Sequence, residues 1–535
     1  MDTETRLYLR EDVYFEPLVN QWYAWPYLLP PVTGARHMVN THRRIMSSFV
    51  KNYKLHIMAV NQPGMAGAEF LDCNEDQVDD IKALVARIDE QHADLVELSD
   101  AVRQLDELLR THTSGESIEY LYAQVPPPLK GYVEIFMDLE HHPSYRLLES
   151  LLYKSPYYKP SLQSIAFGIL GERGDRPFVL STPRLPTADS LHVEVDYNDP
   201  LLDAVFAART QPLTESALDA LFAGKTVSGG LHYRKLFTET PPGHRNQPVE
   251  SGVRLQYLGH AGFLLQTSQV SIVVDPVIAS RGADFSDEVI SFSQLPDRID
   301  YVCITHNHQD HANLESLLQL RHKIGKILVP KNNGGTLSDP SLRLLLKQFG
   351  FDVMEMDDMD ELPVPGGRIV SVPFLGEHGD LNVRSKTAWF YELLGKKIFM
   401  GADSSNLDPS MYRHIGRWLG EMDVMAIGME CVGAPYTWLY GALHTKLVSK
   451  KIKESRRLNG SDFAQAYEIA EIFKPSQVYL YALGMEPWYK YFMGLDYDES
   501  SEQIVQTGKM LDACRDKQIP AERLYGKMTL ELAGT

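Results

Sequence analysis

The stretch "CITHNHQDHANLE", residues 303–315, constrains the fold more than any other part of the chain. It places His306, His308, Asp310 and His311 within six residues, directly after the strand-like run "DYVCIT". In extended chain that leaves a strand, residues two apart point the same way, so His306 and His308 can hold one metal ion together. Asp310 and His311 come where "DHANLESLLQL" becomes helical, so they diverge and can hold a second ion. The motif therefore predicts a two-metal site at a strand end.

The bulk composition indicates an ordinary globular protein and excludes some partners. The 535 residues include 71 Asp and Glu against 52 Lys and Arg, a net charge of -19, which argues against binding to nucleic acid or to an anionic membrane surface. No apolar run approaches the roughly 20 residues that a spanning helix needs. Four scattered cysteines form no C-x-x-C pair, and the first residues lack the apolar core of a signal peptide, so we expect a reducing, cytoplasmic location.

The sequence predicts two domains joined by a linker. Residues 1–236 are expected to form a mixed α/β domain, in which apolar residues three or four apart between Val78 and Leu109 predict one long core-facing helix or two in series. Residues 237–252, rich in Pro, Gly and Thr, are the expected linker. In residues 253–535, strand-like runs alternate with helical ones, and the candidate ligands lie at strand ends. That order predicts two sheets sandwiched between helices.

A family resemblance rests on the motif together with "YLGHAGFLL" and "VVDPVI". These segments resemble the metallo-β-lactamase superfamily, which implies an αββα sandwich with a dinuclear site at one edge of its sheets. The resemblance also implies three later ligands at strand ends. Asp403 in "FMGADSSN" matches the bridging carboxylate, and His444 in "YGALHTK" matches the terminal histidine of the second metal.

The third later ligand is ambiguous because Glu377 and His378 stand side by side in "FLGEHGDL", where hydrolases of the superfamily usually have a histidine. The residues alone leave this choice open. With His378 as ligand, the chain would be a dizinc hydrolase of an ester, lactone or phosphodiester. With Glu377, the shell gains a third carboxylate and favours iron, which, unlike zinc, has redox states that can activate O₂.

A closer resemblance covers the whole length. The large N-terminal domain and the segments "FLGEHGDL", "GADSSN", "GMECVGAPY" and "LHTK" resemble the diiron arylalanine β-hydroxylases of chloramphenicol biosynthesis. This implies a cytoplasmic homodimer that uses O₂, two iron ions with an oxo or hydroxo bridge, and an electron-donor reductase. It implies a substrate, p-aminophenylalanine, tethered as a thioester to a carrier domain of a nonribosomal peptide synthetase. Glu377 and Asp403 would be ligands with catalytic roles, Glu430 would be a third catalytic residue, and the N-terminal domain would serve dimerisation and substrate access.

Three other features carry weaker expectations. Glu430 in "GMECVG" is expected at a strand end, where it either tunes the cluster through a hydrogen bond to a ligand or caps the surface. His260 in "LGHAGF" is expected to shape a turn rather than to bind metal. The basic run "KLVSKKIKESRR", residues 446–457, is either a solvated helical face or a docking site for an acidic carrier domain.

Overall fold

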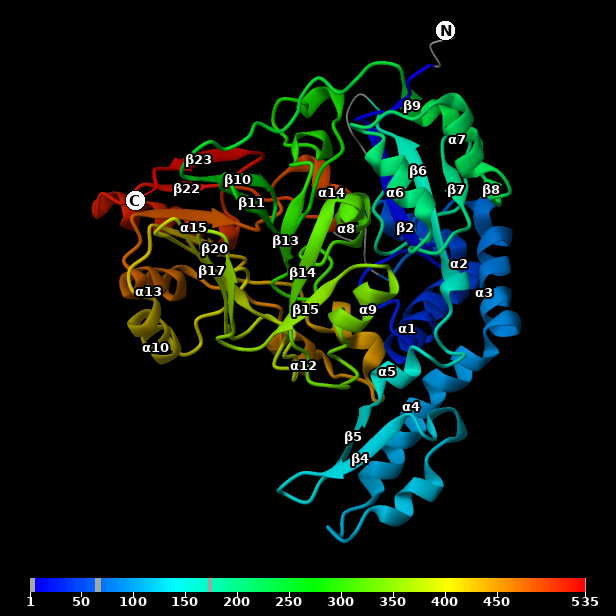
Figure 1. Ribbon diagram of the computed structural model, residues 1–535. Coiled ribbons are helices and arrows are strands. Elements are labelled where there is room, and N and C mark those ends of the chain that lie inside the picture. The colour runs from blue at the N-terminus through cyan, green and yellow to red at the C-terminus, as the bar shows by residue number, and fades with distance from the viewer. Residues whose placement is uncertain (1–4, 63–68, 172–175, 535) are drawn as a thin grey trace.

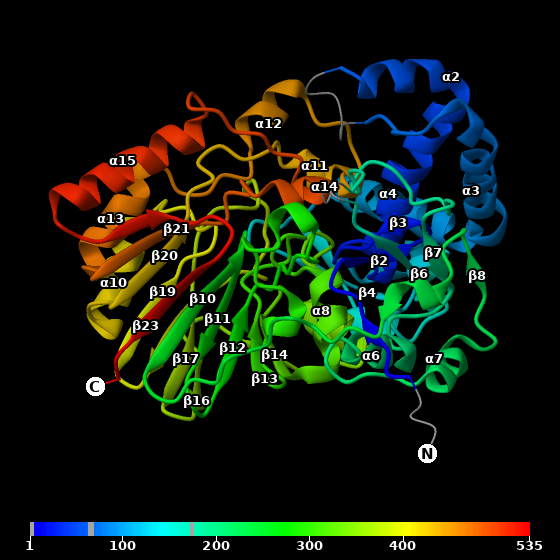
Figure 2. The same cartoon turned by 90° about the horizontal axis from the view of Figure 1, so that it is seen from above.

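A computed structural model of the chain describes residues 5–62, 69–171 and 176–534. Its C-terminal half is a sandwich of two seven-stranded sheets, and its N-terminal half packs along one side of that sandwich (Figure 1). Figure 2 shows the strands of both large sheets running side by side, with helices on the outside. The predicted αββα architecture behind a mixed α/β domain is therefore confirmed.

The N-terminal domain contains a five-stranded sheet and a set of helices. The apolar period between Val78 and Leu109 forms two helices in series, α3 (Val78–Gln91) and α4 (Ala93–Thr111), which meet at His92. The sheet has the order β3-β2-β6-β7-β8. Its strands are β2 (Val13–Val19), β3 (Trp22–Tyr23), β6 (Gln163–Ile169), β7 (Leu191–Val193) and β8 (Val227–Ser228), and the other helices of the domain are α1 (Pro31–His37), α2 (Arg44–Val60), α5 (Glu149–Leu152), α6 (Pro200–Ala207) and α7 (Glu215–Phe222).

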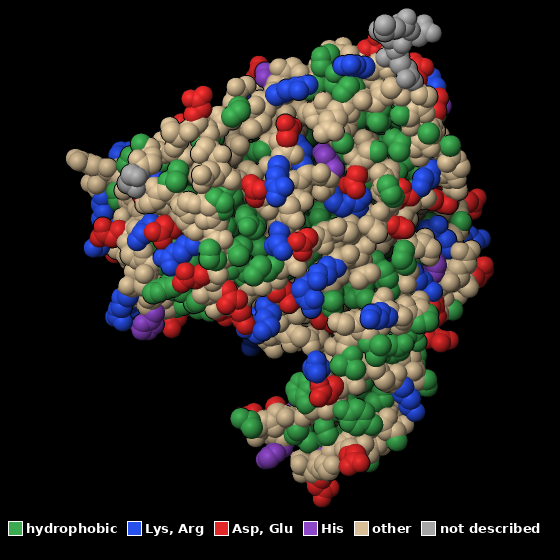
Figure 3. Space-filling model, viewed as in Figure 1, with side chains coloured by type: hydrophobic (Ala, Val, Ile, Leu, Met, Phe, Trp, Pro, Cys, Tyr) green, Lys and Arg blue, Asp and Glu red, His purple; other side chains and the backbone are tan. Residues whose placement is uncertain are grey.

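An arm projects from the body of the molecule (Figure 1). It consists of the end of α4 and the hairpin of β4 (Val133–Met137) and β5 (Pro143–Leu147). Hydrophobic side chains gather on it (Figure 3), and several are exposed, among them Leu139 at 94% and Phe136 at 41%. An apolar surface of this kind is typical of a protein contact.

The two large sheets are each antiparallel at one end and parallel at the other. The first has the order β15-β14-β13-β12-β11-β10-β23, and the second has the order β16-β17-β18-β19-β20-β21-β22. The strands are β10 (Val253–Gly259), β11 (Gly262–Gln266), β12 (Ser271–Val274), β13 (Ile299–Cys303), β14 (Ile324–Pro330), β15 (Val353–Met356), β16 (Glu361–Val364), β17 (Gly367–Val372), β18 (Ala388–Leu393), β19 (Lys396–Met400), β20 (Val424–Gly428), β21 (Gln477–Tyr481), β22 (Ala521–Arg523) and β23 (Met528–Leu532).

Three apolar layers hold the sandwich together. One lies between the two sheets, and another lies between the second sheet and the helices α10 (Pro409–Leu419), α13 (Phe463–Phe473) and α15 (Glu502–Asp516). The outer face of the first sheet is covered by α8 (Leu314–Leu320) and α9 (Leu342–Gln348), and there the core continues without a break into the N-terminal domain. The two halves therefore share a hydrophobic core.

The connection between the halves runs from β9 (Phe237–Thr238), which pairs with β1 (Tyr8–Leu9), to the start of β10 at Val253. The first two residues of the predicted linker thus belong to a strand of the N-terminal domain.

None of the helices in the described ranges combines the length and the apolar composition that crossing a membrane requires.

Candidate metal centre

The histidine-rich motif lies in the loop between β13 and α8. Its histidines are buried, with exposed fractions of 0% for His306, 5% for His308 and 0% for His311. The loop ends at Asn313, whose side chain accepts a hydrogen bond of 2.8 Å from the backbone N–H of Ser316 and so starts α8. The short capped helix fixes where the motif leaves the sheet.

Residues from several strand ends converge on this loop. Four overlapping groups have candidate ligand atoms within 4.8 Å of one another: His306, His308 and Glu377; His306, His311 and Asp403; His260, Asp310 and His311; and Glu377, Asp403 and Glu430. These eight side chains supply four imidazoles and four carboxylates. That is enough for two metal ions with a shared carboxylate.

The first ligand group forms around His308. Its Nδ1 lies 2.9 Å from Oε1 of Glu377 and 3.2 Å from Nε2 of His306, so the three donors face one point. His378 belongs to none of the four groups, and its Nδ1 lies 2.7 Å from the hydroxyl of Tyr440. The sequence leaves the choice between Glu377 and His378 open, and the geometry favours Glu377 as the ligand.

The second ligand group forms around His311. Its Nε2 lies 2.9 Å from Oδ2 of Asp403 and 3.6 Å from Oδ2 of Asp310. The same Asp403 oxygen lies 3.9 Å from Nε2 of His306, which belongs to the first group. Asp403 thus stands between the two groups, as a bridging ligand would.

The backbone around the site is strained. Six residues other than glycine adopt positive φ in the loops that follow strands at this edge: His260 (48°), Asp275 (39°), Glu377 (71°), Ala402 (48°), Cys431 (59°) and Ala482 (58°). For residues with a side chain this conformation is costly, and it persists where the surroundings impose it, often at functional sites. One of the six is the candidate ligand Glu377, and another, Ala402, directly precedes the candidate ligand Asp403.

Outer contacts fix the orientation of two of the histidines. Nδ1 of His311 donates to Oδ2 of Asp275 at 2.7 Å, which leaves Nε2 free to bind a metal ion. Asp275 also accepts the backbone N–H of Thr305 at 2.7 Å. On the other side, Nε2 of His308 lies 3.1 Å from the hydroxyl of Tyr440, which leaves Nδ1 for the metal.

Burial and crowding shift the pKa values of the candidate ligands. Burial, together with the charges of Asp403 and Asp310, raises the pKa of Glu377 well above its usual value. Burial and neighbouring imidazoles hold the pKa of His306 well below its usual value, and burial lowers the pKa of His308 to about 4. Neutral imidazoles are the form that binds metal, and a nearby cation would relieve the repulsion between buried carboxylates.

The buried polar atoms of the site fit metal ligation. Oε2 of Glu377, Oδ1 of Asp403 and Nδ1 of His260 are buried and have no hydrogen-bond partner among the described residues. A buried carboxylate oxygen without a partner is costly, whereas a metal ion would satisfy it. The mixed oxygen and nitrogen donor set suits iron or zinc.

Comparison with known proteins decides between a diiron hydroxylase and a dizinc hydrolase. Residues 8–241 match the diiron non-heme beta-hydroxylase N-terminal domain, and residues 271–479 match the beta-lactamase superfamily domain. The chain is 39% identical to the 4-amino-L-phenylalanyl-[CmlP-peptidyl-carrier-protein] 3-hydroxylase of Streptomyces venezuelae over 98% of this chain and 100% of that protein.

The chain belongs to the diiron β-hydroxylase family. The fold agrees: the crystal structure of CmlA, a diiron beta-hydroxylase from Streptomyces venezuelae, superposes with a TM-score of 0.91 and 38% identity, covering 99% of this chain and 100% of that one. A mutant of the CmlA beta-hydroxylase superposes with a TM-score of 0.89, 38% identity and coverage of 98% and 100%. The protein is thus a diiron hydroxylase.

One expected ligand of the diiron β-hydroxylase lies away from the cluster. His444, expected to complete the second metal site, is half-buried, with its ring 5.4 Å from that of Tyr436 and its carbonyl bonded to Arg36. It belongs to none of the four groups. His260 lies closer to the candidate ligands: it stands in the turn between β10 and β11, and its Nε2 lies 2.9 Å from Oδ2 of Asp310.

Glu430 lies beside the candidate ligands. No hydrogen bond joins its carboxylate to a candidate ligand among the described residues, so the expected tuning contact is absent there. Instead, the carboxylate lies within ligand range of Glu377 and Asp403. Burial and the charges of these two neighbours raise its pKa well above the usual value. The signals for this position in the sequence are the strand end before Glu430 and the family-like segment "GMECVGAPY".

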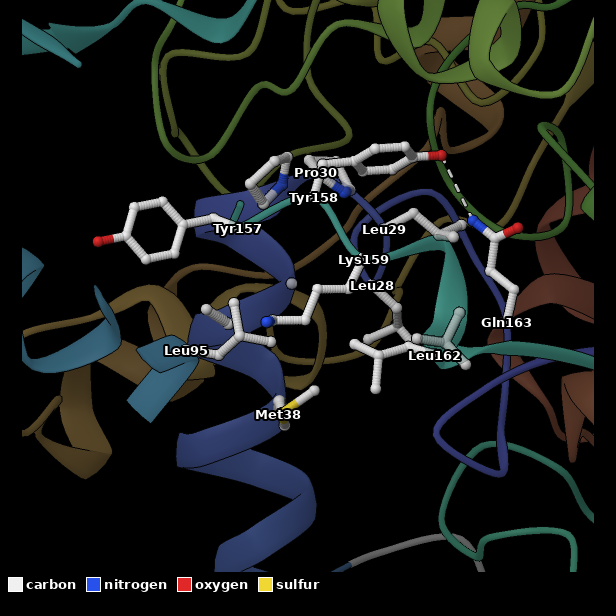
Figure 4. Close-up of a pocket in the computed structure, with 14 residues that line it drawn as sticks. Leu28, Leu29, Pro30, Met38, Leu95, Tyr157, Tyr158, Lys159, Leu162 and Gln163 are labelled. Carbon is white, nitrogen blue, oxygen red and sulfur yellow. Dashed lines mark hydrogen bonds between the residues drawn. The ribbon is translucent and has the colours of Figure 1, made fainter. Parts of the chain in front are cut away.

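A pocket elsewhere in the protein is separate from this centre. It lies in the N-terminal domain (Figure 4), where Leu28, Leu29 and Met38 face Leu95 of α4 and the segment 157–163. None of the candidate ligands lines it. We therefore assign the chemistry to the buried cluster and not to this pocket.

Proposed function

We propose that the protein is an O₂-dependent monooxygenase that hydroxylates the β-carbon of 4-aminophenylalanine while this amino acid is held as a thioester on a peptidyl carrier domain, in chloramphenicol-type antibiotic biosynthesis. The observation that carries the proposal is the 39% identity to a hydroxylase named for that substrate over nearly the whole of both chains. In the reaction, one oxygen atom of O₂ enters the C–H bond, and the other leaves as water with two electrons and two protons from an external reductase.

We further propose how the residues would hold two iron ions. His306, His308 and Glu377 would hold one, Asp310 and His311 the other, and Asp403 both, with Glu430 and His260 in ligand range. Bound iron supplies the redox chemistry that O₂ activation needs and that zinc lacks. Asp275 and Tyr440 would keep the imidazoles in their metal-binding tautomers, and burial of the site excludes water. The β-carbon is a sensible target because the aromatic ring delocalises a developing radical.

The remaining features of the proposal are a homodimer, a reductase partner and a cytoplasmic location. The exposed apolar side chains of the arm, including Phe136 and Leu139, support a contact between two copies. The four cysteines are free and buried, which suits a reducing compartment. Sedimentation of the full chain at several concentrations would test the dimer.

The test of the proposed reaction is a metal count followed by a single turnover. The purified protein should contain about two iron ions per chain and absorb in the near ultraviolet. After reduction and exposure to ¹⁸O₂ with 4-aminophenylalanyl carrier domain, the product should gain one ¹⁸O atom at the β-carbon. A colourless protein with two zinc ions would instead support a hydrolase, and hydroxylation of the free amino acid alone would contradict the tethered substrate.

A further inference from the structure

Residues 437–455 form a lobe that leaves the catalytic domain and returns to it at one place. The base of the lobe is closed by pairing between residues 434–436 and 456–458. There the N–H of Tyr436 donates to the carbonyl of Arg456 at 3.1 Å, and the N–H of Leu458 donates to that of Ala434 at 2.9 Å. The lobe contains α11 (Thr437–Tyr440) and α12 (Lys450–Ser455).

The inner side of the lobe reaches the metal centre and the N-terminal domain. Tyr440 is buried, and its hydroxyl contacts both His308 and His378. Arg36 of α1 donates to the carbonyl of His444 at 2.8 Å, and Asn40 donates to that of Ala442 at 2.9 Å. Figure 2 shows α11 and α12 on the side where α2 and α4 approach the catalytic domain. The lobe is therefore held firmly from both domains.

The outer side of the lobe is apolar and basic. Trp438 is 69% exposed, Leu447 is fully exposed, and Ile452 is 42% exposed. Trp438 and Tyr440 are two residues apart on α11, so they point about 200° apart, one outward and one toward the metals. The same segment carries four exposed lysines: Lys446, Lys450, Lys451 and Lys453.

The two arginines of the basic run, Arg456 and Arg457, bond to backbone carbonyls and do not extend the lysine surface. Nε of Arg456 donates to the carbonyl of Gly379 at 2.7 Å, and Nε of Arg457 donates to that of Gly433 at 2.7 Å. They fasten the base of the lobe. Of the lysines, Lys450 lies 3.5 Å from Glu454, and the four lysines together outnumber this one acidic side chain of the lobe. This patch is positively charged, although the chain as a whole has a net charge of -19.

We propose that the outer side of residues 437–455 is the docking surface for the carrier domain that delivers the substrate. This rests on the proposed function. The lysines complement an acidic partner and the phosphodiester of the phosphopantetheine arm, while Trp438, Leu447 and Ile452 supply apolar contact at its centre. A carrier fits better than an electron donor does, because the tethered amino acid must reach the metals themselves. The lobe links this surface to a metal ligand, His308, through one short helix.

Binding can be measured without turnover. The probe is the isolated carrier domain of CmlP bearing 4-aminophenylalanyl phosphopantetheine, titrated with the iron-loaded, full-length protein by fluorescence anisotropy. Lys450→Glu together with Lys451→Glu should raise the Kd at least tenfold and flatten its dependence on salt. Trp438→Ala should raise the Kd about fivefold without changing the salt dependence. Iron content and the thermal midpoint should match the unmodified protein, which shows that both variants fold.

Lys82→Glu with Lys235→Glu is the matched control, since both lysines are exposed on the N-terminal domain. It should leave the Kd unchanged. An unchanged Kd in the Lys450/Lys451 variant, or no binding by the unmodified protein, would overturn the docking site. Slower reduction by an electron donor with normal carrier binding would also overturn it. Binding that follows the prediction without hydroxylation would leave the docking site standing and reject the proposed function.

Discussion

At the scale of single residues, the second contact of each histidine decides how it can bind metal. His311 lies between Asp275 at Nδ1 and Asp403 at Nε2, and the two contacts measure 2.7 and 2.9 Å. Although burial opposes a charge on His311, the nearby carboxylates outweigh it and raise the pKa of the imidazole. Bound metal would replace the proton on Nε2, whereas Asp275 keeps the proton on Nδ1.

Asp275→Asn should therefore weaken metal binding about 10- to 100-fold. The amide keeps the size of the side chain but cannot accept from both Thr305 and His311 as the carboxylate does. Iron retention against a chelator measures the effect. Asp284→Asn, in an exposed turn, is the control and should keep its iron. Equal retention in the two variants would show that Asp275 does not support the cluster.

The adjacent pair Glu377 and His378 gives a second prediction at this scale. Glu377→Gln should lose at least one of the two irons, because an amide is a poor iron ligand compared with a carboxylate. His378→Gln should keep both, because His378 contacts Tyr440 and belongs to no ligand group. Iron counts on the two purified variants decide the matter. The reverse pattern would make His378 the ligand.

At the scale of elements, the sequence predicts metal ligands well where they lie close together in the chain. It predicts them poorly where the path of a loop determines their position. The motif after β13 is local, so the convergence of His306, His308, Asp310 and His311 follows from strand and helix geometry. Asp403 was found through its place at the end of β19 and a family resemblance. His444 belongs to none of the four groups, because pairing between residues 434–436 and 456–458 carries it into the lobe, and no periodicity reveals that pairing.

Arg456 connects this lobe with the turn that carries Glu377. Besides its bond to Gly379, its guanidinium lies 4.3 Å from the ring centre of Tyr436. Arg456→Met should therefore loosen both segments: proteolysis within residues 437–455 should become faster, and iron should be lost more quickly to a chelator. Arg413→Met, which removes an exposed ion pair with Glu468 on neighbouring helices, is the control. Normal iron retention in Arg456→Met would separate the lobe from the metal site.

At the scale of the whole molecule, the sequence predicts two domains but not how closely they join. The sandwich follows from alternating strands and helices, whereas the N-terminal domain carries no motif of its own. Its attachment depends on contacts between residues far apart in the chain. Arg176 donates to Glu315 of α8 and to Glu16 of β2, with distances of 2.9 and 3.0 Å, and all three side chains are at most 5% exposed.

The last prediction tests this buried junction. Arg176→Met would leave Glu315 buried with only hydroxyl donors, those of Tyr23 and Tyr491. Removing one partner of a buried ion pair costs about 3–5 kcal/mol of unfolding free energy, whereas an exposed pair contributes about 0–1 kcal/mol. Calorimetry should show a clearly lower thermal midpoint for Arg176→Met than for Arg103→Met, which removes exposed ion pairs on α4.

Because α8 follows the metal motif directly, the Arg176→Met variant should also release iron faster than the unmodified protein. When Arg176→Met is combined with Glu315→Gln, the thermal midpoint should rise part of the way back to that of the unmodified protein, because the uncompensated charge is then removed. If the single and double variants unfold at the same temperature, the loss comes from packing of the guanidinium against Tyr491, 3.5 Å from the ring centre, and not from charge. If neither variant shifts the midpoint, the junction does not hold the N-terminal domain to the catalytic one.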